Sequence, residues 1–327
     1  MILLVFSILT SAVWAASTPE VPIQRIAVIS DLNGSYGSTR YGSDVKAAVE
    51  RLSELKPAVV LATGDLVAGQ KAGLDYRAMW RSFHQTVTLP LQEAGIPLAV
   101  TVGNHDGSGY PKFAEERRIF EDEWKTHLPA VKYSNIEHYP FFYSFESGDL
   151  AFIALDTTRV GPLSNQNLEW LENELKKLGS SKTLVLFAHV PLFHFADIPL
   201  GESYFDKGLM DLIRRYGVKL YLTGHHHSFY PGYFESTHFV SQSCLGSGPT
   251  RLNGADQTSA KSFTVIDFYV NRFEIYALKA PLFIEKIDTL GMPHALDSAG
   301  RTLRLKESGV LVDRSFSSED DARDSFF

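Results

Sequence analysis

Short apolar runs alternate with amphipathic stretches along most of this chain. Five runs rich in β-branched residues have the composition of buried strands, namely 26–29, 59–62, 98–102, 184–187 and 218–222. Apolar residues recur with helical spacing over 43–56, 74–94, 111–127, 164–178 and 203–216, and Ser43 is the expected N-cap of the first helix. Strands that alternate with helices predict an α/β fold.

A further group of strands follows the pattern of hairpins. The runs 141–145 and 150–155 flank Ser147-Gly148-Asp149, a sequence typical of a tight turn. Strands are also expected near 237–243, 261–270 and 272–278, with Asn271 at the turn between the last two. We expect residues 297–327 to form one more hairpin, over 297–315, and then a solvated tail.

Polar side chains capable of binding metals follow each of the five apolar runs. They occur in Asp31-Leu32-Asn33, Gly64-Asp65, Gly103-Asn104-His105-Asp106, His189 and Gly224-His225-His226-His227. Each motif alone is also compatible with a turn or an exposed loop. Loops beyond the carboxyl ends of strands converge on one crevice, so the five motifs together predict one metal site. Carboxylates and imidazoles without thiolates suit divalent ions other than structural zinc.

In this order the motifs resemble those of the calcineurin-like metallophosphoesterase superfamily, which includes the purple acid phosphatases. The family pattern is D-x-H, G-D, G-N-H-[DE], a lone His and G-H-x-H, and the resemblance extends from residue 24 to about 245. Asn33 stands where the family usually has His, and Ala68 where purple acid phosphatases have a ligating Tyr. The resemblance implies a four-layer α/β/β/α sandwich with two mixed sheets, in a domain spanning 17–296.

The resemblance also implies two divalent metal ions, each of them Mn, Fe, Zn or Mg. It assigns Asp31, Asn33, Asp65 and His227 to the first ion, and Asp65, Asn104, His189 and His225 to the second, with Asp65 bridging. In such a site a metal-bridging hydroxide attacks a phosphoester. His105 would act as the acid, and Asp106 would hold the tautomer of His105. His226 would point away from the ligands if its segment is extended.

Three further residues are candidates for binding the substrate. Arg40 and Tyr36 lie in the glycine- and hydroxyl-rich loop after Asn33, and His194 follows His189 by five residues. The alternative for Arg40 and Tyr36 is a flexible loop without a binding role. The alternative for His194 is a partly exposed loop histidine. The aromatic clusters at 139–145 and 229–234 could stack a nucleobase, but core packing is the preferred interpretation.

The favoured function is an exported phosphatase or phosphodiesterase acting on a small phosphorylated substrate. A second hypothesis, suggested by Asn33, is a catalytically weakened family member that binds phosphorylated ligands or partners. A third is a metal-dependent hydrolase of a non-phosphate bond. The 100 residues that follow His227 are too few for the second domain of an exported two-domain 5'-nucleotidase.

The N-terminus and the overall charge bear on location and partners. Residues 2–16 form an apolar run that ends in small residues, which predicts a signal peptide over 1–16 and a periplasmic or secreted protein, although no Lys or Arg precedes the run. The run is shorter than the roughly 20 residues of a membrane span, so none is expected after cleavage. A net charge of -7 without a Lys/Arg cluster argues against a nucleic-acid-binding surface. The oligomeric state stays open.

Overall fold

The computed structural model describes residues 20–199, 202–246 and 248–311. The predicted signal peptide at 1–16 and the tail at 316–327 lie outside the described residues. Within them the strands form two sheets. The first has the order β13 (Glu285–Lys286), β12 (Arg272–Lys279), β11 (Ser262–Phe268), β1 (Gln24–Ile29), β2 (Val59–Ala62) and β3 (Leu98–Val100), and β16 (Ser308–Val310) also pairs with β12.

The second sheet is larger. Its order is β14 (Ala295–Ser298), β15 (Arg301–Leu305), β9 (Tyr230–Phe234), β10 (Thr237–Ser241), β8 (Leu220–Thr223), β7 (Thr183–Phe187), β6 (Leu150–Ala154), β5 (Phe142–Ser147) and β4 (Lys132–His138). Both sheets are mixed: β1, β2 and β3 are parallel in the first, and β6, β7, β8 and β10 in the second, whereas β11 and β5 pair antiparallel with their neighbours.

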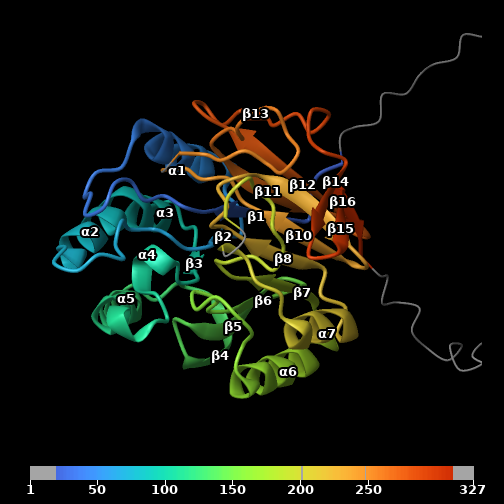
Figure 1. Ribbon diagram of the computed structural model, residues 1–327, viewed down its shortest axis with the longest axis horizontal. Coiled ribbons are helices and arrows are strands. Elements are labelled where there is room, and N and C mark those ends of the chain that lie inside the picture. Colours follow the sequence, from blue (N-terminus) through green and yellow to red (C-terminus); the bar gives the residue numbers. More distant parts are fainter. Residues whose placement is uncertain (1–19, 200–201, 247, 312–327) are drawn as a thin grey trace, which may run out of the picture.

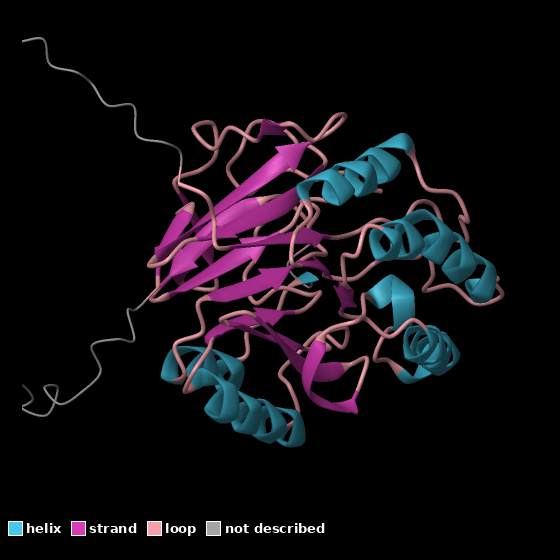
Figure 2. Ribbon diagram, turned by 180° about the vertical axis from the view of Figure 1, so that it is seen from behind, coloured by secondary structure: helices cyan, strands magenta, loops and turns pink. Residues whose placement is uncertain are grey.

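Helices flank the two sheets on their outer sides (Figures 1 and 2). They are α1 (Ser43–Leu55), α2 (Tyr76–Phe83), the π-helical segment η1 (His84–Thr88), α3 (Leu89–Glu93), α4 (Asn104–Gly107), the 3-10 turn η2 (Pro111–Phe113), α5 (Ala114–Thr126), α6 (Asn165–Gly179) and α7 (Lys207–Arg215). The predicted α/β sandwich is confirmed. No helix among the described residues is both long and apolar enough to cross a bilayer.

Strand β6 shows how the layers share the core. Leu150, Phe152 and Ala154 belong to the larger apolar cluster, together with buried residues of the first sheet. Ala151 and Ile153 point to the opposite face and pack with α6 and α7. Successive side chains of a strand point to opposite faces, so a central strand with helices on one side and a sheet on the other is apolar throughout. This explains the continuous apolar runs in the sequence.

Three sequence expectations differ from the structure. The helix predicted over 74–94 is divided into α2, η1 and α3, because Pro90 has no N–H for the helical ladder and the chain passes through a π-helical turn before it. The N-cap of α1 is Gly42, and no side chain caps the helix. Strand β4 was not predicted, because it is an edge strand whose residues are only partly buried and show no apolar alternation.

The C-terminal hairpin is part of the sheets. It lies at β14 and β15, begins at Ala295 rather than 297, and β15 is hydrogen-bonded to β9. The chain then crosses to the first sheet, where β16 pairs with β12. Residues 295–310 therefore extend both sheets, and the boundary predicted at 296 does not separate them from the fold.

Candidate metal centre

The predicted ligands follow five strands whose carboxyl ends lie at one edge of the sandwich. Asp31 follows β1, Asp65 follows β2, and the GNHD motif follows β3; His189 and the GHHH motif follow β7 and β8. Immediately after the strands the backbone turns sharply. Four residues there have positive φ angles of 51° to 67°: Asp31, Asp65, His225 and His227. This conformation is costly for residues other than glycine and is concentrated at functional sites.

Glycines let these loops approach one another. A Cβ atom on Gly103 would lie 2.0 Å from the Asp65 nitrogen and 2.2 Å from its Oδ1 atom. One on Gly224 would lie 1.9 Å from Ser30 Oγ and 2.8 Å from Asp31 Oδ2. No side chain fits at such distances. The glycines in the GNHD and GHHH motifs therefore place backbone directly against the carboxylates.

Asp31 and His227 form the first group of ligand atoms. Asp31 is fully buried, and its Oδ1 atom lies 3.1 Å from His227 Nε2. Its Oδ2 atom accepts hydrogen bonds from Ser30 Oγ and the His225 N–H. His227 Nδ1 lies 3.0 Å from the Gly248 carbonyl, which can only accept, so Nδ1 carries a proton. The Asn33 N–H donates to the Asp65 carbonyl at 3.1 Å, which places buried Asn33 beside this group.

The second group gathers around His189. The Nδ1 atom of His189 lies 2.7 Å from the Thr63 carbonyl, and its Nε2 atom lies 2.9 Å from Asn104 Oδ1 and 3.3 Å from Asp65 Oδ1. Ligand atoms of Asp65, His189 and His225 all lie within 4.8 Å of one another. The Asn104 amide nitrogen donates to Gln70, so the amide oxygen faces His189.

Both groups have the donor arrangement of a cation site. In His189 and in His227 one ring nitrogen donates to a backbone carbonyl and the other faces side-chain oxygens, an arrangement that either a second proton or a metal ion satisfies. Burial opposes the second proton, but Asp65 raises the pKa of His189 to about 9 and Asp31 raises the pKa of His227 to about 12. Burial alone would raise the pKa of Asp65, but His189 and His105 lower it. Imidazole, carboxylate and amide oxygen suit Mn, Fe, Zn or Mg.

His105 lies at the rim of these groups. Its Nε2 atom is 3.9 Å from Asp65 Oδ2, its backbone N–H donates to Asp65 Oδ1, and its Nδ1 atom is 3.1 Å from the Gly69 carbonyl. The carbonyl of Gly69 therefore fixes the tautomer of His105.

Asp106 does not have the predicted role. Its Oδ1 atom accepts the N–H groups of Leu66 and Val67 at 2.7 and 3.0 Å, and its Oδ2 atom accepts the N–H of Gly103 at 2.9 Å. Among its side-chain hydrogen bonds with described residues none reaches the ring of His105. Asp106 is fully buried, and burial together with the charge of Asp65 raises its pKa to about 7. It joins the loops after β2 and β3.

The predicted substrate residues are placed differently from one another. Tyr36 is 57% exposed, with its ring centroid 5.5 Å from that of His105, so it lies at the mouth of the site. Arg40 is exposed, and its guanidinium makes no hydrogen bond or ion pair within the described part of the chain. His194 is only 8% exposed; its ring packs against His226 and its N–H donates to Ser298. The structure therefore does not support contact between His194 and a substrate.

Sequence reasoning missed Glu202, whose Oε2 atom lies 2.9 Å from His225 Nε2. It lies far from every motif, in the loop before α7, and no pattern marks it. His226 is buried and outside both groups: its Nε2 atom donates to the Glu202 carbonyl and its Nδ1 atom accepts from the Phe195 N–H. Burial and the neighbouring His225 lower the pKa of His226 to about 3, so its ring is neutral.

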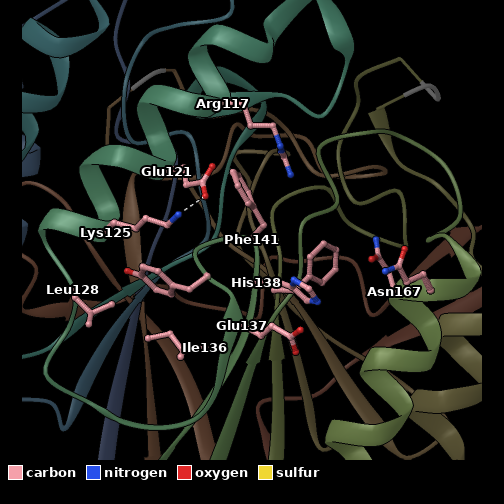
Figure 3. A pocket seen from close by; sticks show the side chains of 12 residues that line it. Arg117, Glu121, Lys125, Leu128, Ile136, Glu137, His138, Phe141 and Asn167 are labelled. Atoms are coloured by element: carbon pink, nitrogen blue, oxygen red, sulfur yellow. Dashed lines mark hydrogen bonds and ion pairs between the residues drawn. The ribbon is translucent and has the colours of Figure 1, made fainter.

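A separate cleft of about 630 Å³ lies between α5, β4 and α6 (Figure 3). Its walls include Arg117, His138, Phe141 and Asn167, and no predicted metal ligand lines it. The Arg117 guanidinium lies 3.7 Å from the centre of the Phe141 ring and donates to the Gly107 carbonyl. Most other aromatic residues in the segments 139–145 and 229–234 belong to the core, which agrees with the preferred interpretation of core packing. Tyr143, Phe145, Phe229 and Tyr230 are buried.

Comparison with known proteins identifies the family. The profile of the calcineurin-like phosphoesterases matches residues 24–229, which contain all the predicted ligands. The chain belongs to the calcineurin-like phosphoesterase family. The predicted enzyme class, a metal-dependent phosphoesterase, is that of this family.

Three similar proteins fit this assignment. The chain is 26% identical over 233 residues to the mouse serine/threonine-protein phosphatase CPPED1, covering 65% of this chain and 69% of the relative. It is 25% identical over 250 residues to purple acid phosphatase 15 of Arabidopsis thaliana, covering 65% of this chain and 42% of that longer protein. The crystal structure of a dimetal phosphatase from Danio rerio has the same fold, with a TM-score of 0.55 at 14% identity over 81% of this chain and 98% of that one.

Proposed function

We propose that this protein is an exported dinuclear phosphoester hydrolase that acts on small phosphorylated substrates. The observation that carries the proposal is the meeting of two ligand groups at one loop: Asp65 contacts His189, and it also accepts hydrogen bonds from His105 and, through its backbone, from Asn33. When bound there, divalent ions supply Lewis acidity, which activates water and neutralises phosphoryl charge. Asp31, Asn33, Asp65 and His227 would hold one ion, and Asp65, Asn104, His189 and His225 the other.

His105 is placed to protonate the leaving group. Its Nδ1 proton is held by the Gly69 carbonyl, so the proton available for transfer is on Nε2, which faces the ligand groups. The acid form is then the imidazolium, with the Asp65 carboxylate as its counter-charge 3.9 Å away. Exposed Tyr36 forms one wall beside His105, and Arg40 belongs to the same loop, where its exposed guanidinium is suited to phosphate oxygens.

The test replaces His105 by Ala and compares phosphoesters with good and poor leaving groups, such as nitrophenyl and alkyl phosphates. We expect turnover of alkyl esters to fall by about 10² to 10⁴, the usual contribution of general acid catalysis, and turnover of nitrophenyl esters to fall much less. Metal content should stay at the wild-type level. His138→Ala, on exposed strand β4, is the matched control and should change neither.

Asp65→Ala tests the dinuclear part of the proposal. If one carboxylate bridges both ions, metal analysis should show both lost together, with activity. Equal losses for both ester classes in His105→Ala would argue against the acid role, and full metal content in Asp65→Ala would contradict the shared ligand. The alternative function, a weakened phospholigand-binding protein, rests on Asn33 and predicts turnover that remains near zero with every added metal.

A further inference from the structure

A second cluster of metal-ligand side chains lies outside this centre, near the contact between α2 and α5. Figure 1 shows these two helices as neighbours. The cluster consists of His84, Glu123 and His127, whose ligand atoms all lie within 4.8 Å of one another. His84 begins η1, and Glu123 and His127 are four residues apart at the end of α5, so they share one face of that helix. We propose that these three side chains bind a divalent transition-metal ion such as Zn²⁺.

The ring of His127 has the hydrogen bond to a backbone carbonyl that is common for metal-binding histidines. Its Nδ1 atom lies 2.9 Å from the Glu123 carbonyl. A carbonyl only accepts, so the proton of the neutral ring is on Nδ1 and Nε2 keeps its lone pair. Ligating histidines commonly donate their second nitrogen to a backbone carbonyl in this manner.

His84 contributes a buried ring nitrogen, Nε2. Its side chain is 5% exposed, and within the described residues its Nε2 atom has no hydrogen-bond partner. Glu123 Oε2 is 3.7 Å away, too far for a hydrogen bond. His84 Nδ1 lies 2.9 Å from Thr88 Oγ1; when it donates there, the lone pair on Nε2 faces the carboxylate. A cation between Nε2 and the carboxylate makes this arrangement favourable.

The third ligand and the spacing agree with this. Arg77 donates to Glu123 Oε1 at 3.2 Å, which leaves Oε2 on the side of His84. The two imidazole rings are stacked with centroids 3.5 Å apart. Two ligand atoms of a tetrahedral zinc ion, each about 2.0–2.1 Å from the metal, lie about 3.3 Å apart. The ligand atoms of this cluster lie within 4.8 Å of one another, so the two stacked rings would tilt toward a shared ion on binding. Thr88 and His127 also line a pocket of about 290 Å³, which leaves space for water as a fourth ligand.

Two tryptophans make the site measurable by itself. The ring of His84 lies 5.9 Å from that of Trp80 and 5.5 Å from that of Trp124. A paramagnetic ion bound to His84 would quench their fluorescence at short range. The experiment uses the full chain in an Asp65→Ala background, which lacks the bridging ligand of the other centre, after removal of metals with a chelator. Zn²⁺ binding is measured by equilibrium dialysis and Co²⁺ binding by tryptophan fluorescence.

We expect one Zn²⁺ per chain at micromolar or tighter affinity, and Co²⁺ quenching that Zn²⁺ prevents. Adding His127→Ala or Glu123→Gln should weaken binding by at least about 10- to 100-fold, the loss that even outer partners of a ligand cause, and should abolish the quenching. His127 is partly exposed, so its removal leaves the core intact, and circular dichroism checks folding. His138→Ala is the control and should bind as the background does.

Three results would overturn the proposal: no quenching in the Asp65→Ala background, unchanged affinity in both ligand variants, or an equal loss in His138→Ala. If Asp65→Ala kept the ions of the other centre, the stoichiometry would exceed one. The quenching and its loss in His127→Ala would still report on this site alone. Failure of the proposed dinuclear centre could therefore be distinguished from failure of this second metal site.

Discussion

Replacing Asp106 by Asn tests whether this residue organises the site or orients His105. The carboxylate accepts three backbone N–H groups in a fully buried position. The amide of Asn has one acceptor oxygen, so either the Gly103 N–H or the N–H groups of Leu66 and Val67 would face an NH₂ donor. An unsatisfied buried N–H costs about 1–3 kcal/mol. Burial and the charge of Asp65 raise the pKa of the Asp106 carboxyl to about 7, so replacing this costly buried charge recovers part of the loss. We expect a net destabilisation of about 2 kcal/mol.

Chemical denaturation of chelator-treated protein measures this effect without a contribution from metal binding. Because the loops after β2 and β3 carry Asp65 and Asn104, we also expect Asp106→Asn to bind metal more weakly and to lose activity on good and poor leaving groups alike. Asp149→Asn, an exposed hairpin position, is the control and should match wild type. Wild-type stability combined with a loss confined to poor leaving groups would refute this reasoning and restore a role through His105.

Three further predictions concern other parts of the chain. Asn33→His should tighten retention of one ion during dialysis against a weak chelator, because imidazole is the stronger donor toward borderline metals; equal retention in wild type would remove the support for a weakened enzyme. Burial, and then Lys306, lower the pKa of His238 to about 4. The unfolded chain therefore takes up a proton at this residue before the folded one does, and up to about 3 kcal/mol of stability is lost as pH falls from 6.5 to about 4. His238→Gln should flatten that pH dependence in denaturation experiments, and an unchanged slope would contradict it. Native material should begin at or near Ala16 or Ser17 by N-terminal sequencing, whereas Met1 would exclude cleavage.

The sequence predicts the strands of this fold better than its edges. Central strands such as β1 and β7 are buried on both faces and appear as continuous apolar runs. Strand β4 at the edge of its sheet, and β13 with two exposed residues, have no such pattern. Their positions depend on pairing with strands already in place, which single-sequence periodicity does not contain.

The metal ligands can likewise be predicted from the sequence, whereas the groups that orient them cannot. Asp31, Asp65 and His189 follow strands directly, so the sequence places them at the sheet edge and the structure brings them together. The Gly69 carbonyl beside His105, the Gln70 amide beside Asn104 and the Glu202 carboxylate beside His225 come from loops, and only the folded chain brings them there. Asp106 shows the consequence. Its place in the GNHD motif suggested an interaction with its neighbour His105, yet its carboxylate points to the backbone of another loop, because a buried carboxylate is most stable where several N–H groups converge.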